Sequence, residues 1–155
     1  MPVSYREQYD RIRRWYDRFV ALDQGRPHDV ASDNYLDEIY AFFMNCYHLK
    51  DWIKHDSTVA ASVQQSVEAH INSNRALRLC ADICNSLKHF RLTSSRSGES
   101  PAFGNKQFGL ALGHGPPTIK LAYEVDTTSG PIDAFQLATE CVDAWDTFLA
   151  ANGMK

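Results

Sequence analysis

The chain has 155 residues, with 16 lysines and arginines against 19 aspartates and glutamates, a formal charge of −3 at pH 7. This length predicts one domain, residues 1–155, and the 44% hydrophobic content excludes wholesale disorder. The acidic balance excludes a general attraction to nucleic acid. No apolar run approaches the ~20 residues of a membrane-spanning helix, and no apolar segment follows the charged N-terminus. We therefore expect a soluble, cytoplasmic protein without a membrane partner.

Apolar periodicity predicts four helices in the first part of the chain. In each, apolar side chains recur at steps of three and four residues, the spacing of one helical face. The predicted helices cover about residues 5–24, 33–54, 57–71 and 74–90. Ser4 and Glu7 have the spacing of a capping box at the first helix start. Residues 25–29 are predicted to form a loop.

The composition changes after this helical part. Residues of about 93–105 are polar, lack periodicity and predict a flexible stretch. The segments 106–112 and 118–125 predict two strands, hence a hairpin over about 106–125. A last helix is predicted over about 132–151. The expected fold class is mainly α, a bundle of about five helices with a β-hairpin inserted before the C-terminal helix.

The four cysteines lie inside the apolar helical patterns. Cys46, Cys80, Cys84 and Cys141 form no Cys-x-x-Cys pair. Their positions predict reduced core residues of a cytosolic protein, not disulfides or a zinc cage.

A polar ridge marks the predicted 74–90 helix. Its members are spaced 4, 3 and 4 residues apart and share one line on the helix: Arg78, Asp82, Asn85 and His89. His89 has the chemistry of a general base, and Arg78, Lys88 or Arg91 that of a phosphate ligand. The simpler interpretation is an Arg78–Asp82 ion pair beside a solvated Asn85 and His89.

Lys50 lies on the apolar stripe of the 33–54 helix, between Cys46 and Ile53. A buried ammonium without a partner costs several kcal/mol. We expect Lys50 to reach a carboxylate, a carbonyl or a ligand, with Asp82 as one candidate. The alternative is that its head extends to solvent at the edge of the stripe.

His48, Asp51 and His55 share another face of that helix and suggest part of a metal site. This face points away from the apolar stripe, so a solvated polar face is favoured. No metal and no cofactor is predicted.

The helices 33–54 and 74–90, taken as an antiparallel pair, resemble the HEPN superfamily of helical domains. The family motif is an arginine, often followed by a polar residue, then a histidine four to six residues on. Asn85 and His89 match the last two positions. The resemblance implies a metal-independent endoribonuclease of a bacterial defence or toxin type, or a nucleotide-binding protein. His89 would activate the ribose 2′-hydroxyl, and Lys50, Arg78, Asp82 and Lys88 would bind substrate.

The resemblance also implies a homodimer in which the two motif helices face each other. The residue before Asn85 is Cys84, where the family has arginine. This departure and the acidic charge favour an alternative, a non-catalytic helical interaction or dimerisation module. A helical-bundle metal-binding protein remains a third hypothesis.

Overall fold

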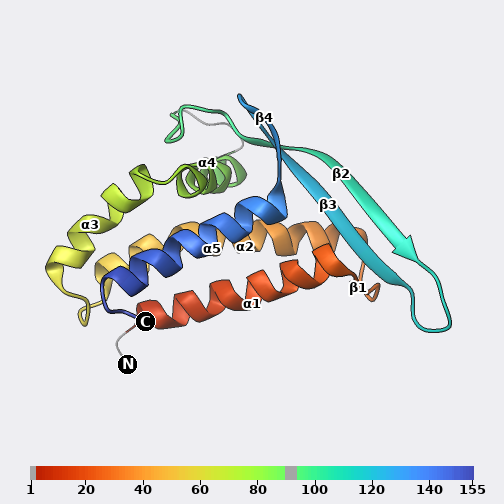
Figure 1. Cartoon of the computed structure of the whole chain (residues 1–155), viewed down its shortest axis with the longest axis horizontal. Coiled ribbons are helices and arrows are strands. Elements are labelled where there is room, and N and C mark those ends of the chain that lie inside the picture. Colours follow the sequence, from red (N-terminus) through yellow and green to blue (C-terminus); the bar gives the residue numbers. More distant parts are fainter. Residues whose placement is uncertain (1–2, 90–93) are drawn as a thin grey trace.

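The computed structural model describes residues 3–89 and 94–155. Phe90, the last residue of the predicted 74–90 helix, and Arg91, a suggested phosphate ligand, lie outside the described residues. The elements follow one another along the chain as α1 (Tyr5–Gln24), β1 (Arg26–Pro27), α2 (Ser32–His55), α3 (Ala61–Asn72), α4 (Arg75–His89), β2 (Ala102–Ala111), β3 (Thr118–Thr127), β4 (Gly130–Asp133) and α5 (Ala134–Ala151) (Figure 1).

The predicted fold class is wrong in its β part. The described residues form a four-stranded antiparallel sheet, where the sequence predicts a two-stranded hairpin in a mainly-α bundle. β3 is central and pairs with β2 along one edge. β1 and β4 pair with the other edge, with Arg26 opposite Ile119 and Glu124 opposite Asp133. The chain is therefore an α+β domain, with helices packed on one face of an antiparallel sheet.

The missed strands are short and lie where other patterns dominate. β1 has only two residues, one of them Pro27, which cannot donate a ladder hydrogen bond. β4 lies where the last helix is predicted to begin. The turn before it closes at Gly130, whose φ of 108° suits glycine. Asp133 then caps α5 by accepting a hydrogen bond from the Gln136 amide.

β3 attaches the sheet to the helices. Its side chains alternate, and four of them are buried on one face against the helical core: Ile119, Leu121, Tyr123 and Val125. This face contacts α1 and α5. The Tyr123 and Tyr40 hydroxyls lie 3.0 Å apart, which ties β3 to α2. The far end of the β2–β3 hairpin extends beyond the helices (Figure 1).

The helices do not all run in the same direction. α1, α2 and α5 run roughly side by side, whereas α4 is seen nearly end-on (Figure 1). α4 therefore crosses α2 steeply, and the expected antiparallel pairing of these two helices is not observed. Trp145 of α5 is fully buried, and its indole nitrogen donates to the Cys46 carbonyl at 3.1 Å. None of the described helices combines the length and apolar character needed to cross a membrane.

All four cysteines are free and buried, which confirms the prediction that they are core residues. They come from α2, α4 and α5, so the cysteines mark where these three helices meet.

A buried carboxylate joins the start of α1 to the turn after α2. Asp56 is 2% exposed, and its oxygens accept from the Tyr5 amide at 2.8 Å, the Thr58 amide at 2.8 Å and the Thr58 hydroxyl at 2.6 Å. Burial raises the pKa of this carboxyl, but the hydrogen bonds outweigh burial and hold the pKa below its ordinary value. Because residues 56–60 form this turn, α3 begins at Ala61 and not at residue 57.

Replacing Asp56 by asparagine should lower the free energy of unfolding by about 1–3 kcal/mol at pH 7. The folded-state pKa lies below the unfolded value of about 3.9, so the charge stabilises the fold above that pH. This contribution disappears as the pH falls through the folded-state pKa. Urea unfolding at pH 7 and pH 3 should show the difference between wild type and variant shrinking in acid. Asp10→Asn, on the exposed side of α1, is the matched control, and a pH-independent difference at Asp56 would contradict the assignment.

Candidate functional site

Asp82 is fully buried and organises the loop that follows α4. Its carboxylate accepts from the Ser95 hydroxyl at 2.9 Å, the Arg96 amide at 2.7 Å and the Ser97 amide at 2.9 Å, and also from the Ser97 hydroxyl. No ion pair joins Asp82 to Arg78 or Lys50 in the part of the chain that the structure describes. Both partners suggested by the sequence are therefore replaced by a loop, and the Asp82 carboxylate is not free to bind substrate.

The same loop is held at two further points. The Arg96 guanidinium pairs with Glu68 of α3, which also binds Lys54 at 2.5 Å. Burial raises the pKa of the Glu68 carboxyl, but the hydrogen bonds from Lys54 and Arg96 outweigh it and lower the pKa. Arg75 pairs with Glu99 at 3.0 Å. Residues 94–101, which belong to the stretch predicted to be flexible, are thus anchored to α3 and α4. The sequence feature that could have indicated this anchored loop is Asp82, a lone aspartate in an otherwise apolar helix centre.

Lys50 is satisfied by its own helix. Its ammonium lies 2.8 Å from Asp51 Oδ1 and 4.9 Å from the centre of the Tyr47 ring. Burial lowers the pKa of this amine, but the hydrogen bond to Asp51 and the nearby negative groups outweigh burial, so the pKa is raised. Lys50 therefore stays charged. Its contacts are with Asp51 and Tyr47 and do not join it to His89.

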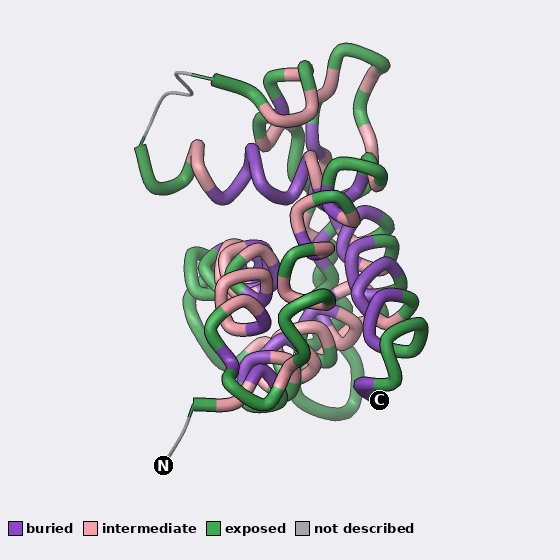
Figure 2. The backbone as a smooth tube through the Cα atoms, turned by 90° about the vertical axis from the view of Figure 1, so that its left-hand side faces the viewer, coloured by how far each residue is buried: buried purple, intermediate pink, exposed green. Residues whose placement is uncertain are grey.

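The C-terminal turn of α4 carries the exposed part of the candidate site. Asn85 is half-buried, whereas Lys88 and His89 are exposed. This end of α4 extends away from the other helices (Figure 2). Within residues 3–89 and 94–155, no side-chain hydrogen bond or ion pair joins Lys88 or His89 to another residue. The turn therefore presents an amide, an ammonium and an imidazole to solvent.

Arg78 lies too far along α4 to join that group. His89 lies eleven positions after Arg78, about 16 Å along the helix axis. The Arg78 Nε atom is buried and has no hydrogen-bond partner among the described residues. The predicted ridge is therefore divided into an N-terminal arginine, a buried central aspartate and an exposed C-terminal turn.

Cys84 occupies the position where the HEPN motif has arginine. Its sulfur is buried and lies 3.9 Å from Nε2 of His48 on α2. Burial raises the pKa of the thiol to about 11, so Cys84 is neutral near pH 7. It cannot replace the positive charge of an arginine at this position.

The three residues suggested as metal ligands have separate partners. His48 contacts Cys84, the Asp51 carboxylate binds Lys50, and Nδ1 of His55 lies 2.7 Å from the Asp51 carbonyl oxygen. Within the described residues, these three side chains do not gather around one point. The group that does so consists of three buried cysteines, Cys46, Cys80 and Cys141.

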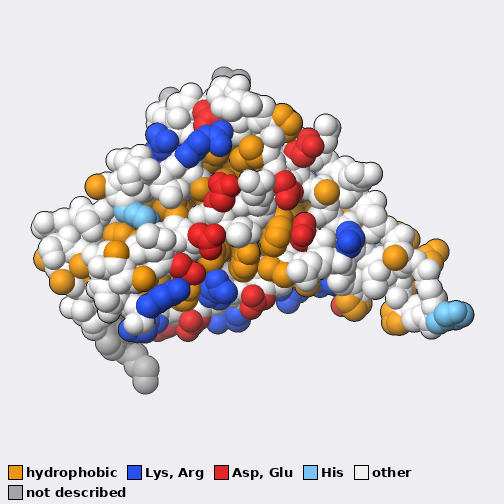
Figure 3. Space-filling view, viewed as in Figure 1, with side chains coloured by type: hydrophobic (Ala, Val, Ile, Leu, Met, Phe, Trp, Pro, Cys, Tyr) orange, Lys and Arg blue, Asp and Glu red, His pale blue; other side chains and the backbone are white. Residues whose placement is uncertain are grey.

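The surface offers no broad field of one sign on the face drawn in Figure 3, where acidic and basic side chains are mixed. On this face, any attraction for an anionic ligand is therefore local. Comparison of the chain with protein-family models, curated proteins and solved structures finds no match.

Replacing Asp82 by alanine should cost about 3 kcal/mol of unfolding free energy, because the loop loses several charge-assisted hydrogen bonds. The variant should also be cut faster by trypsin after Arg96, since the loop loses its main anchor. Asp143→Ala, an exposed position on α5, should change stability by less than about 0.5 kcal/mol. Equal trypsin rates for wild type and Asp82→Ala would show that the loop does not depend on this carboxylate.

Proposed function

We propose that the protein is a cytoplasmic domain that carries a HEPN-like motif at Asn85 and His89 and acts on RNA as a metal-independent endonuclease of a bacterial defence or toxin type. The observation that carries the proposal is the exposed C-terminal turn of α4, with Asn85, Lys88 and His89 close together on one projecting helix end. A polar turn in this position gives a phosphodiester access without disturbing the core. Asp82 supports the site by holding the loop that follows α4, whereas Lys50 is paired with Asp51 on α2.

The chemistry requires proton transfer and a local positive charge. His89 supplies an imidazole as the general base, which removes the proton from a ribose 2′-hydroxyl. The 2′-oxygen attacks the adjacent phosphorus, a cyclic phosphate forms, and the 5′-oxygen leaves after it is protonated. Lys88 binds the phosphate oxygens, and Asn85 orients the ribose or the phosphate.

A homodimer completes this site. A second copy with its α4 end facing the first brings a second Lys88 and a second His89 to the same phosphodiester. The added charge compensates for the neutral Cys84, and the second imidazole serves as the acid for the leaving group.

Replacing His89 by alanine should reduce RNA cleavage in EDTA by about 10²–10⁴-fold, the usual contribution of a general acid or base. The measurement is the initial rate on total RNA followed by gel electrophoresis. His114→Ala removes an exposed histidine from the β2–β3 connection and is the matched control, with an unchanged rate. Cleavage that persists unaltered in His89→Ala would refute this mechanism.

A second candidate function is a non-catalytic dimerisation module. It is favoured by the buried, neutral Cys84 at the arginine position and by Leu87, which is 39% exposed on the same helix end. A contact between two α4 ends would remove this apolar side chain from water.

Replacing Leu87 by aspartate should weaken dimerisation at least about tenfold, because it places a charge in the contact between the two α4 ends. Sedimentation velocity over a concentration series measures the dimer dissociation constant. Leu112→Asp, at a position 79% exposed in the β2–β3 connection, should leave that constant unchanged. A dimer without RNA cleavage would favour the module, whereas a wild-type protein that stays monomeric would contradict both dimeric forms.

A further inference from the structure

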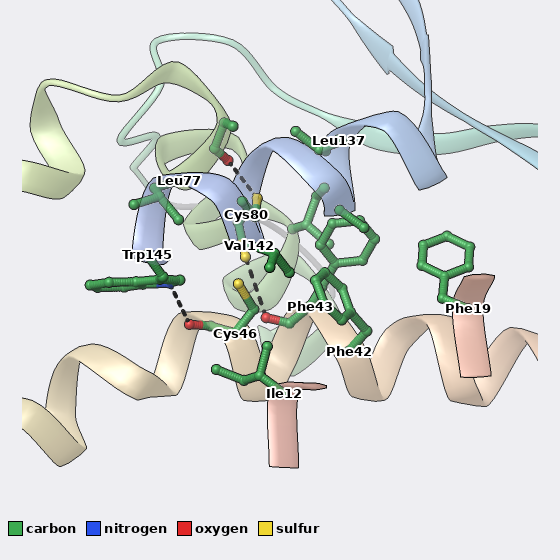
Figure 4. Packing of buried hydrophobic residues seen from close by; sticks show 14 of the residues in the cluster. Ile12, Phe19, Phe42, Phe43, Cys46, Leu77, Cys80, Leu137, Val142 and Trp145 are labelled. Atoms are coloured by element: carbon green, nitrogen blue, oxygen red, sulfur yellow. Dashed lines mark hydrogen bonds between the residues drawn. The ribbon is translucent and has the colours of Figure 1, made fainter. Parts of the chain in front are cut away.

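Three of the four cysteines meet in the core. Cys46 of α2, Cys80 of α4 and Cys141 of α5 are fully buried, and their sulfur atoms all lie within 4.8 Å of one another. Figure 4 shows Cys46 and Cys80 among Phe43, Val142 and Trp145. Three helices that are far apart in sequence therefore bring three soft ligand atoms to one point.

Two of the three thiols donate hydrogen bonds to backbone carbonyls. Cys80 donates to the Phe43 carbonyl and Cys141 to the Ala76 carbonyl, each at 3.4 Å. Contact with the Cys141 and Cys46 thiols raises the pKa of Cys80, and burial raises that of Cys141. Binding of an ion at these sulfurs therefore has to displace the thiol protons.

The spacing suits one shared ion. Metal–thiolate bonds are about 2.3 Å long, so three sulfurs around one ion lie about 4 Å apart. The sulfurs are already near this separation, and small rotations of the side chains close the remainder. Thiolates are the preferred ligands of soft ions.

The surroundings select the charge of that ion. In the described chain, no hydrogen bond or ion pair joins a lysine, arginine or histidine to the three sulfurs. A net charge in this apolar place would be costly. Three thiolates leave a charge of −1 with a divalent ion and −2 with a monovalent ion, but a neutral centre with a trivalent ion.

We propose that Cys46, Cys80 and Cys141 bind one trivalent thiophilic ion, arsenic(III), as a neutral three-thiolate centre. Arsenic(III) enters as arsenous acid, As(OH)₃. Three As–O bonds and three S–H bonds break, three As–S bonds form, and three water molecules leave without any change in oxidation state. Because the sulfurs are buried, loading proceeds through transient opening of the core or during folding.

The test uses the full chain, reduced with a phosphine and then desalted. It is incubated with sodium arsenite, once as folded protein and once during refolding from denaturant. Native mass spectrometry should show one bound arsenic with the loss of three protons. The melting temperature should rise, because the ion binds the folded state only. A wild-type protein that carries no arsenic after either treatment overturns the proposal, as does stoichiometric binding of Zn²⁺ in preference to arsenic(III).

The cysteines provide matched variants. Cys46→Ala, Cys80→Ala and Cys141→Ala should each lose the three-proton arsenic adduct. Cys84→Ala removes a buried cysteine from the same helix as Cys80 but leaves the cluster intact, so it should keep the adduct. Circular dichroism shows which variants fold, and the proton count on wild type remains decisive if the cluster variants do not. Loss of the adduct in Cys84→Ala, or its retention in a folded cluster variant, refutes the site.

Discussion

The buried carboxylate of Asp82 is the constraint on which much of the structure depends. A charge at the centre of α4 is tolerated only with a full set of hydrogen-bond donors. The chain supplies these donors by folding residues 95–97 back onto the helix. That return places Arg96 on Glu68 of α3 and brings the chain to the start of β2. One aspartate thus fixes where α4 meets α3 and where the sheet begins.

This arrangement separates two properties of α4 that share one line on the helix. The centre is structural, because Asp82 is consumed by the loop. The C-terminal turn is exposed, because nothing described covers Lys88 or His89. Substitutions in this turn can therefore change a function located there without disturbing the core. Stability and activity can thus be altered independently.

The helices could be predicted from the sequence because local periodicity determines them, and the apolar steps place α1, α2, α4 and α5 to within a few residues. The full sheet could not be predicted. β1 and β4 are two and four residues long, and they exist only because β3 offers them an unpaired edge. The partners of Asp82 and Lys50 were also beyond prediction. Several groups can satisfy a buried charge, and only tertiary packing decides which one lies near.

β4 passes into α5 without a connecting residue, since Asp133 ends the strand and caps the helix. The direct junction therefore fixes the orientation of α5 relative to the sheet. A single residue inserted at this junction would turn α5 by about 100° about its axis, moving Trp145 and Cys141 away from α2. The length of this junction is accordingly as strict a requirement as the identity of any residue in the core.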